Sequence, residues 1–566
     1  MTVHLNEYAY LDSVSEALSE ALHNCNDGDT LYLGGGTIEI DRLCATPKFY
    51  YLPRYSDEKK YYSVYLENRR NITIDGEGAT LIFDGDISPF GFESCFGITL
   101  KNFNIDYKMP FSVQALITEA NSNYFEVTYC SDEYTVKYDA LSRELYAVSA
   151  HSDYTLSLSS CLACEFDSDP YRIAEATPVY FLCTGEEHPV YKSMSVPVDT
   201  QELGRNRFRF TFKEKTNKHH RIGKYLVQAD HSRKNTDFHF LRCENIRMEN
   251  INMYASASFG VVTLLCKNIS IDNVNSVVKP RSTRALAVNA DVFHMVNTSG
   301  KIEITDCIME NNLDDSINIH SLLSVVRNKI NKNTLLLDFT YLAKKALNLY
   351  RPDEHINILD KDTFECCGKL TVKSSEYMGD YCLRVEFKEN VDGVKTDSLI
   401  ESEDAKPEVY VCNCRSGNNR GRGFLLPVGR KTVVERCKFY NLSAGISVNG
   451  ASLDYLEGSA VNGLVIRNND FLSCAKHSSG FPILIKPLGT DGKRKTPYHN
   501  DIKILNNRFI SNGKRFVMIK SAQNILISGN TYIFDKDQTA HDNCSDNGIE
   551  LIDCVNADIN SAFSNI

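Results

Sequence analysis

The sequence predicts an all-β fold, a right-handed parallel β-helix, and three observations support this prediction. A motif of Asn or Gly, a short alternating apolar strand and an Asn-rich turn recurs along the chain of 566 residues. The interval between the starts of neighbouring copies is a little over twenty residues. The copies contain short strands and turns but no helix. A repeat of that length built from strands alone is typical of a solenoid with one rung per repeat.

The spacing is clearest where two copies follow one another directly. Ile246 and Ile269 occupy the same place in successive copies, about 23 residues apart, and Ile502 and Ile525 do so again. Asparagine suits the turns between strands because it tolerates the left-handed backbone conformation. The longer gap between Leu464 and Ile502 indicates a loop inserted at one corner of the solenoid, where binding faces are usually built.

An amphipathic helix is expected over residues 13–24, ahead of the first strand. Its apolar residues, among them Leu18 and Leu22, fall on one face at the period of an α-helix. Ser13 and Glu16 have the spacing of a capping box. A helix in this place can cover the end of a solenoid, whose core would otherwise be exposed.

Two stretches, residues 109–232 and residues 322–411, break the repeat. Both contain alternating strands without the rung motif. Such strands predict small antiparallel β inserts, barrel-like, that emerge from the solenoid. The chain is therefore expected to divide into five parts: residues 1–108 with the cap and the first rungs, 109–232 as the first insert, 233–321 as the central rungs with the catalytic site, 322–411 as the second insert, and 412–566 as the C-terminal rungs.

Composition argues against two classes of partner. The formal net charge is −11, and an acidic surface repels a phosphate backbone, so we expect no nucleic acid. No apolar run approaches the roughly 20 residues of a membrane-spanning helix, so we expect no membrane. Residues 1–30 lack the basic and apolar regions of a secretory signal. The 19 scattered cysteines are typical of reduced thiols, and both features predict a cytoplasmic protein.

The densest group of chemically active side chains lies in two successive copies of the repeat. Asp291 and His294 precede one rung. Asp314 and Asp315, with His320 beyond them, close the next. Because stacked rungs are one strand spacing apart, about 4.8 Å, Asp291 is expected to lie beside Asp314 or Asp315. The sequence thus predicts three carboxylates and two histidines on one face.

Crowded carboxylates suit glycoside hydrolysis. The reaction needs one carboxyl group to protonate the leaving oxygen and another to activate water or to attack carbon. Crowding raises the pKa of one of them, which creates the acid. The alternative is structural, since Asp and Asn also cap the turns of a β-helix. Adjacent like charges one rung from a third carboxylate favour a functional site over that alternative.

Two further groups would assist at such a site. Arg420 and Arg422 lie in a segment rich in Gly and Asn, and arginine can hold a carboxylate or donate to sugar hydroxyls. Tyr455 and Glu457 place an aromatic ring next to a carboxylate, which suits the apolar face and the hydroxyls of a sugar. A solvated basic turn and an ordinary exposed loop are equally open interpretations of the two groups.

Four segments, in their order along the chain, carry a family resemblance. They are residues 103–107 with Pro110, residues 289–291 with His294, residues 313–320, and residues 419–423 followed by Glu457. A chain with this order of motifs resembles the exo-acting α-1,3-galactosidases of glycoside hydrolase family 110. The resemblance covers most of the chain. It implies a β-helix with small β-barrel inserts and the inverting hydrolysis of terminal α-1,3-linked galactose.

The resemblance also implies roles for residues and partners. Asp291, Asp314 and Asp315 become the candidate catalytic carboxylates, without a decision on which is the acid and which the base. The expected partner is a galactose-terminated oligosaccharide or glycan, with no cofactor and no metal, and the family's frequent pairing favours a homodimer. The expected substrate-binding residues are Arg284, His294, Asn318, His320, Arg420, Arg422, Tyr455 and Glu457.

Other β-helix proteins stay open as alternatives. A polygalacturonase-like or other polysaccharide-degrading enzyme also combines Asp, Asp-Asp and His. It is expected to carry an Arg-x-Lys clamp soon afterwards, and none follows His320 before the second insert. A polysaccharide lyase would need Ca²⁺ and a basic residue. A non-enzymatic carbohydrate-binding solenoid predicts no convergent carboxylates, so the arrangement of Asp291 and Asp315 separates these alternatives.

Overall fold

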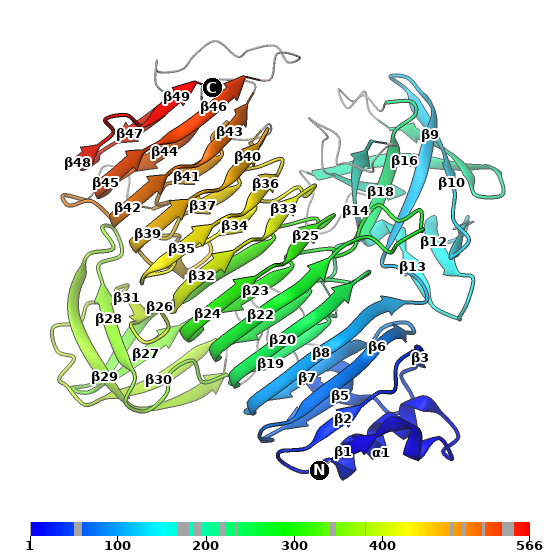
Figure 1. Ribbon diagram of the computed structural model, residues 1–566, viewed down its shortest axis with the longest axis horizontal. Coiled ribbons are helices and arrows are strands. Elements are labelled where there is room, and N and C mark those ends of the chain that lie inside the picture. Colours follow the sequence, from blue (N-terminus) through cyan, green and yellow to red (C-terminus); the bar gives the residue numbers. More distant parts are fainter. Residues whose placement is uncertain are drawn as a thin grey trace.

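The chain forms a parallel β-helix, which confirms the all-β solenoid predicted from the repeat (Figure 1). The structure is a computed structural model, and the strands stack along one long axis from the N-terminal to the C-terminal end. The residues that it describes are 2–49, 59–167, 180–184, 194–213, 221–233, 235–339, 347–379, 381–475, 480–489, 494–511, 515–534 and 548–565.

The larger of the two solenoid sheets contains parallel pairings throughout the described residues. Its strands are β1 (Thr2–His4), β2 (Thr30–Tyr32), β3 (Thr37–Ile40), β6 (Thr73–Phe83), β8 (Phe96–Tyr107), β20 (Glu244–Met253), β22 (Lys267–Ser276), β24 (Ser299–Thr305), β25 (Ile308–Glu310), β32 (Glu408–Cys412), β33 (Arg415–Gly417), β35 (Thr432–Glu435), β36 (Lys438–Tyr440), β39 (Asn462–Arg467), β40 (Asp470–Leu472), β42 (His499–Leu505), β43 (Arg508–Ser511), β45 (Ala522–Ser528), β46 (Asn530–Phe534), β48 (Val555–Asp558) and β49 (Phe563–Asn565).

The second solenoid sheet carries most of the residues predicted for the site, on its strands or next to them. Most of its pairings are parallel, whereas β4 with β5 and β26 with β38 are antiparallel. Its strands are β4 (Thr46–Phe49), β5 (Lys59–Glu67), β7 (Ser88–Glu93), β19 (Phe238–Leu241), β21 (Val261–Leu264), β23 (Phe293–Val296), β26 (Ile317–Asn331), β34 (Phe424–Leu425), β37 (Ile446–Val448), β38 (Glu457–Gly458), β41 (Ile483–Ile485), β44 (Val517–Lys520) and β47 (Ile549–Ile552).

The register of the rungs follows the sequence repeat. Ile246 lies opposite Ile269 on one side and Ile98 on the other. Toward the C-terminus, Ile502 lies opposite Ile525 in the same way. The apolar side chains of each strand therefore stack on those of the next rung and form one continuous core.

An asparagine ladder runs from rung to rung at positions inside the strands of the larger sheet. Asn273 donates to Asn250, and Asn250 donates in turn to Asn102, with amide-to-amide distances of 2.9 and 3.0 Å. All three residues have a positive φ, between 50° and 62°. Asparagine suits these positions, because it tolerates the left-handed conformation and its side-chain amide forms a hydrogen bond with the next rung.

The first insert lies between two rungs that touch each other. β8 and β20 pair in parallel although residues 109–232 separate them in the sequence. The insert holds a closed barrel in which one pair, β15 with β16, is parallel and the other pairings are antiparallel. Its described elements are β9 (Ser112–Ala120), β10 (Tyr124–Tyr129), β11 (Tyr134–Asp139), β12 (Glu144–Ser149), β13 (Thr155–Ser157), η2 (Leu158–Ser160), β14 (Cys161–Phe166), β15 (Tyr180–Thr184), β16 (Ser195–Gly204), β17 (Arg207–Phe212) and β18 (Tyr225–Asp230).

The second insert grows directly out of a rung strand. The first residues of β26 pair in parallel with β23, and its later residues pair in antiparallel fashion with β27 and β31. The solenoid resumes at β32, which lies against β24. The remaining strands of the insert pair in antiparallel order. They are β27 (Thr334–Asp338), β28 (His355–Leu359), β29 (Cys366–Gly379), β30 (Cys382–Phe387) and β31 (Leu399–Ser402).

The N-terminal helix α1 (Val14–Asn24) lies beside the first rungs, after the short helix η1 (Leu5–Tyr8) (Figure 1). The hydroxyl of Ser13 accepts a hydrogen bond from the Glu16 N–H at 3.1 Å, as the predicted cap requires. Leu18 and Leu22 are buried in the same core cluster as the strands.

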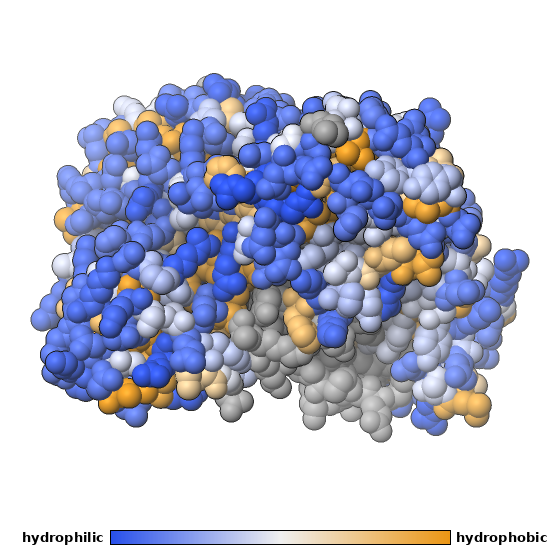
Figure 2. Space-filling model, turned by 90° about the horizontal axis from the view of Figure 1, so that it is seen from below, coloured by the Kyte–Doolittle hydropathy of each residue, from blue (hydrophilic) through white to orange (hydrophobic). Residues whose placement is uncertain are grey.

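The surface is mainly polar on the face that Figure 2 shows, with apolar side chains in small, separate groups. Within the described residues, no helix has the length and apolar character needed to cross a membrane.

Candidate active site

Two adjacent rungs bring the predicted carboxylates together. Asp291 lies two residues before β23, and Asp315 lies two residues before β26, whose first residue is opposite Phe293. The N–H of Asp315 donates to Asp291 Oδ1 at 3.2 Å. One oxygen from each of Asp291, Asp314 and Asp315 lies within 4.8 Å of the others. The one-rung spacing in the sequence is thus a spatial contact.

The asparagines and glycines around these residues hold the backbone of the acidic turn. Asn312 Nδ2 donates to the carbonyl oxygens of Asp314 and Asp315 at 2.7 and 3.1 Å. Asn419 Nδ2 donates to the Asp314 carbonyl at 2.8 Å from the next rung. A Cβ at Gly421 would lie 2.4 Å from the Asp314 carbonyl carbon, so this close approach requires glycine.

Asn289 connects the first insert to the acidic turn. Its Nδ2 donates to the Phe111 carbonyl at 2.9 Å and to the Asp230 carbonyl at 3.4 Å. Phe111 lies at the start of the first insert and Asp230 near its end. The motif residue two positions before Asp291 therefore ties both ends of the insert to the site.

Each carboxylate of the trio has different partners. Asp315 accepts from Arg422 Nε at 2.9 Å and from Arg422 Nη2 at 2.6 Å, a two-point contact. Asp314 accepts from Arg233 Nη2 at 2.8 Å. Asp291 is 2.6 Å from His294 Nδ1. It has no guanidinium contact among the described residues, so it is the carboxyl group with the least compensation by positive charge.

Burial and charge separate the acidities of the three groups. Burial and the neighbouring Asp314 raise the pKa of Asp291 to about 7. Burial opposes the ionisation of Asp314 too, but Arg233, Arg420 and Arg422 lower its pKa to about 2. Burial raises the pKa of Asp315, against the effect of Arg422. Because Arg422 contacts both oxygens of Asp315, the proton that the pair retains belongs mainly on Asp291.

The histidines beside the trio are neutral near pH 7. Burial lowers the pKa of His294 to about 4 and also lowers the pKa of His320. The two rings meet edge to face, with centroids 5.3 Å apart. Glu457 comes from β38, which pairs with β26 next to His320, and its Oε1 is 4.0 Å from His320 Nε2.

A pocket of about 470 Å³ opens over the trio. His320 Nε2 and Asn318 Oδ1 face it as buried polar atoms that have no hydrogen-bond partner within the described part of the chain. A hydroxylated ligand would satisfy them. The pocket brings together ten of the eleven residues expected at the site: Asp291, His294, Asp314, Asp315, Asn318, His320, Arg420, Arg422, Tyr455 and Glu457.

Arg284, expected to bind the substrate, lies elsewhere. It is buried, and it donates to Asp106 Oδ1 at 2.5 Å and to Glu133 Oε1 at 2.6 Å. Lys279 contacts the same Asp106 at 2.8 Å. The guanidinium also donates to the Tyr107 carbonyl. Arg284 thus joins the solenoid to the first insert and does not line the pocket.

Other lining residues escaped the sequence analysis. They share no motif, because they come from separate strands and turns and from the segment after the first insert. Arg233 is the clearest case, since its only signal was a cation at the predicted start of the central rungs. These residues are Arg233, Phe259, Leu322, Leu425, Asn449 and Leu488.

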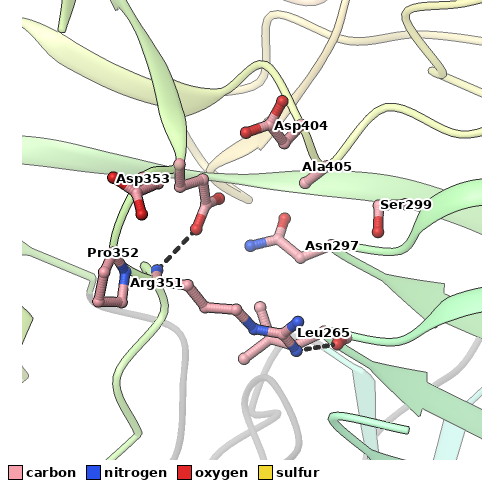
Figure 3. A pocket seen from close by; sticks show the side chains of 9 residues that line it. Leu265, Asn297, Ser299, Arg351, Pro352, Asp353, Asp404 and Ala405 are labelled. Atoms are coloured by element: carbon pink, nitrogen blue, oxygen red, sulfur yellow. Dashed lines mark hydrogen bonds between the residues drawn. The ribbon is translucent and has the colours of Figure 1, made fainter. Parts of the chain in front are cut away.

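A second, smaller pocket of about 200 Å³ lies between the solenoid and the second insert (Figure 3). The Arg351 N–H donates to Glu354 Oε2 at 2.8 Å, and its guanidinium donates to the Leu265 carbonyl at 2.7 Å. None of the residues expected at the site lines it. Its carboxylates do not form a close group like the trio among the described residues.

Comparison with known proteins links the chain to one activity. No family model matches it. Among solved structures, an exopolygalacturonase from Thermotoga maritima aligns with a TM-score of 0.37 and 10% identity over 97% of this chain and 91% of the other. The α-1,3-galactosidase A of Shewanella woodyi is 26% identical over 547 residues, covering 92% of this chain and 83% of the relative.

Two relatives from Bacteroides thetaiotaomicron agree. Its α-1,3-galactosidase B is 26% identical over 529 residues, with 92% of this chain and 83% of the relative covered. Its α-1,3-galactosidase A is 27% identical over 536 residues, with 92% and 89% covered. This similarity over nearly the whole chain confirms the resemblance to the α-1,3-galactosidases of glycoside hydrolase family 110 that the motifs indicated.

Proposed function

We propose that this chain is an exo-acting glycoside hydrolase that releases terminal α-linked galactose, with α-1,3 as the linkage. The observation that carries the proposal is the convergence of Asp291, Asp314 and Asp315 in one pocket. Two buried polar atoms of the pocket, Asn318 Oδ1 and His320 Nε2, have no hydrogen-bond partner in the described part of the chain and suit sugar hydroxyls. The similarity to α-1,3-galactosidases over 92% of the chain supports the choice of galactose.

The chemistry follows from the unequal acidities of the trio. A protonated carboxyl group delivers its proton to the leaving oxygen, and an ionised one takes a proton from water as the water attacks. In the free site Asp291 and Asp315 share the proton, which lies mainly on Asp291, whereas Arg233 keeps Asp314 charged. Arg420, Tyr455 and Glu457 line the rim and bind the rest of the substrate.

The roles of acid and base are separated by the leaving group. A variant that lacks the acid keeps more activity on an aryl galactoside with a good leaving group than on a natural disaccharide. A variant that lacks the base is slow on both substrates. Comparing Asp291→Asn, Asp314→Asn and Asp315→Asn on this substrate pair therefore assigns the roles.

Inversion is proposed on the family resemblance. Inverting glycosidases hold their two carboxyl groups about 6.5–9.5 Å apart and retaining ones about 5–5.5 Å apart. The nearest oxygens of the trio lie within 4.8 Å, so the separation alone does not decide the stereochemistry. Proton NMR of the first sugar released from an aryl α-galactoside decides it. We expect the β-anomer, and initial release of the α-anomer would rule out inversion.

The alternative is a polygalacturonase-like enzyme, which the three arginines of the pocket favour. A uronate needs a guanidinium for its carboxylate. Arg233 and Arg422 are already engaged by Asp314 and Asp315, and Arg420 Nε donates to the Leu313 carbonyl. We therefore rank galactose above galacturonate. Parallel assays on α-galactosides and α-galacturonides test this order.

The proposal extends to the architecture and the setting of the protein. Helix α1 caps the solenoid, and the chain divides at the boundaries expected from the sequence, with each insert a separate β subdomain. Most of the cysteines whose side chains the structure describes are buried, and the absence of framework spacing in the sequence supports a reducing, cytoplasmic location. A homodimer is proposed on the family resemblance, and the molecular mass in solution tests it.

A further inference from the structure

Arg233 lies at the junction of the first insert and the solenoid. Strand β18 ends at Asp230 and β19 begins at Phe238, so Arg233 belongs to the segment through which the chain returns from the insert. Its backbone has a φ of 50°, in the left-handed region that is unfavourable for a residue with a side chain. A non-glycine residue in this conformation is held there by its surroundings.

The contacts of Arg233 hold its side chain against the acidic trio. Its Nη2 donates to Asp314 Oδ2 at 2.8 Å, and its side chain is 12% exposed. The guanidinium lies over the Phe259 ring, 5.0 Å from the centroid, within the range of a cation–π contact. Thr236 of the same segment donates to the Phe259 carbonyl at 2.6 Å. The ring and the segment thus fix the guanidinium in place.

Arg233 is the main positive neighbour of Asp314. Arg420 Nη2 is 4.0 Å from the same carboxylate, and its side chain is 34% exposed. The Nε of Arg420 donates to the Leu313 carbonyl. A partly exposed cation at the longer distance is screened more strongly by water than the nearly buried Arg233.

We infer that Arg233 is a positioning residue: it holds Asp314 as a carboxylate and so confines the proton of the crowded trio to Asp291 and Asp315. The consequence of this role of Arg233 for catalysis rests on the proposed function, but the protonation of the trio can be measured without turnover. Because Arg233 comes from the return segment of the first insert, the insert helps to set the protonation of a site built on the solenoid.

The balance of charges gives the direction of the effect. Three guanidinium groups offset three carboxylates in the wild type, and two offset three when Arg233 is replaced by a neutral residue. The pKa of Asp314 then rises, and so does the proton affinity of the trio as a whole. The groups that face Asp314 from the surrounding segments are Arg233, Asp291, His294, Asp315, Arg420 and Arg422.

The pH profile of kcat/KM for an aryl α-galactoside is the first measurement. In Arg233→Gln we expect both limbs to move to higher pH by about 1–3 units, the effect of losing a cation next to a carboxylate. Arg233→Lys keeps the charge and should restore much of the profile. Arg221→Gln is the matched control, because Arg221 pairs with Glu165 at 3.0 Å within the same insert and outside the pocket.

Infrared difference spectra between mildly acidic and mildly alkaline solution provide a readout that does not depend on activity. The wild type should show a protonated carboxyl band that titrates near neutral pH and disappears in Asp291→Asn. In Arg233→Gln this titration should move to higher pH, and in Arg221→Gln it should not.

The outcomes separate the inference from the proposed function. If the wild type hydrolyses no α-galactoside but the infrared titration moves as expected, the proposed function falls and the inference stands. If Arg233→Gln folds, loses activity and keeps the titration and the pH profile of the wild type, the inference is overturned. If Arg233→Gln does not fold, Arg233→Lys decides by the same spectra. A titration near neutral pH, as in the wild type, supports the inference, and a titration that moves to higher pH although the charge is kept overturns it.

Discussion

Two clusters of arginine and carboxylate in the central part of the molecule show what distinguishes a site from a structural joint. In the joint, Arg284 is 3% exposed and Asp106 is fully buried, and Glu133 and Lys279 complete two positive and two negative charges. Every nitrogen of the Arg284 guanidinium donates to an oxygen. No ligand is needed to satisfy this cluster.

The acidic trio has the same residue types, but polar atoms beside it lack a partner among the described residues. A pocket of about 470 Å³ opens above it. Asp291 has no guanidinium contact among the described residues, and two buried polar atoms of Asn318 and His320 face the opening without a partner. A buried arginine–carboxylate pair is therefore weak support for a site. Carboxylates and polar atoms that lack partners around a cavity are a stronger sign of a functional site.

The largest expected effect comes from neutralising the trio. We expect Asp314→Asn and Asp315→Asn each to lower kcat by at least about 10²–10⁴-fold, because Asn cannot exchange a proton at neutral pH. The fold should persist, since Asn has the shape of Asp and still accepts hydrogen bonds at a turn. Kinetics and melting temperature on the same preparations check both statements.

The control for this pair is Asp501→Asn, because Asp501, with a positive φ of 53°, lies in β42, outside the pocket. It should leave turnover unchanged. If both trio variants keep near-normal turnover and have a lowered melting temperature, the acidic pair only caps its turn. The trio would then be a structural feature like the Arg284 cluster.

The next effect concerns the joint and is one of stability. Arg284→Gln leaves Asp106 and Glu133 without their main partner, and breaking a buried pair from one side costs about 3–5 kcal/mol. We expect a clearly lower midpoint of denaturant unfolding with a nearly unchanged KM of the folded enzyme. Lys279→Gln is the milder control, because Lys279 contacts the same Asp106 but is 39% exposed. A raised KM with unchanged stability would instead support the expectation from the sequence that Arg284 binds the substrate.

A smaller effect appears in the dependence of stability on pH. The pKa of Asp291 is raised to about 7 in the folded chain, against about 3.9 when it is unfolded. Between these values the folded state binds more protons than the unfolded state, so the contribution of this group to stability falls as the pH rises. Asp291→Asn should flatten that part of the curve of melting temperature against pH. An equal slope in the two proteins would contradict the assignment of the proton to Asp291.

The smallest effect expected is that of chelation. The oxygens of the trio lie close enough to one another to resemble a Ca²⁺ site. Arg233 and Arg422 already contact two of the carboxylates, so we expect EDTA to leave activity unchanged. Loss of activity in EDTA, with recovery on addition of Ca²⁺, would instead favour the lyase alternative.

The sequence was most informative where one repeat determined both position and chemistry. The spacing of one rung between Asp291 and Asp315 predicted their contact, because parallel strands convert a fixed sequence interval into adjacency. The same logic placed Ile246 against Ile269. The same motifs contain Asn289, Asn312 and Gly421. These residues hold the backbone around the carboxylates in place, a role that their residue types alone did not reveal.

The sequence was least informative where an insert interrupts the repeat. Arg284 is near Asp291 in sequence, but its partners, Asp106 and Glu133, lie more than a hundred residues away and could not be foreseen. Arg233 reaches the site only because the return segment of the first insert lies beside Phe259. Residues that come into contact across such an insert are not separated by a fixed sequence interval, so the repeat cannot be used to predict these contacts.

The pairing of β8 with β20 has a consequence for how the chain is made. Asn250 donates to Asn102 across 148 residues of sequence. A ribosome that adds about 5–20 residues per second needs roughly 7–30 s to cover that interval. During this time the outer edge of β8 has no partner from its own chain, and an unpaired edge is a template for other strands. The first barrel can complete its own hydrogen bonds in that interval, so the rungs on the two sides of the insert join only after the insert between them has been made.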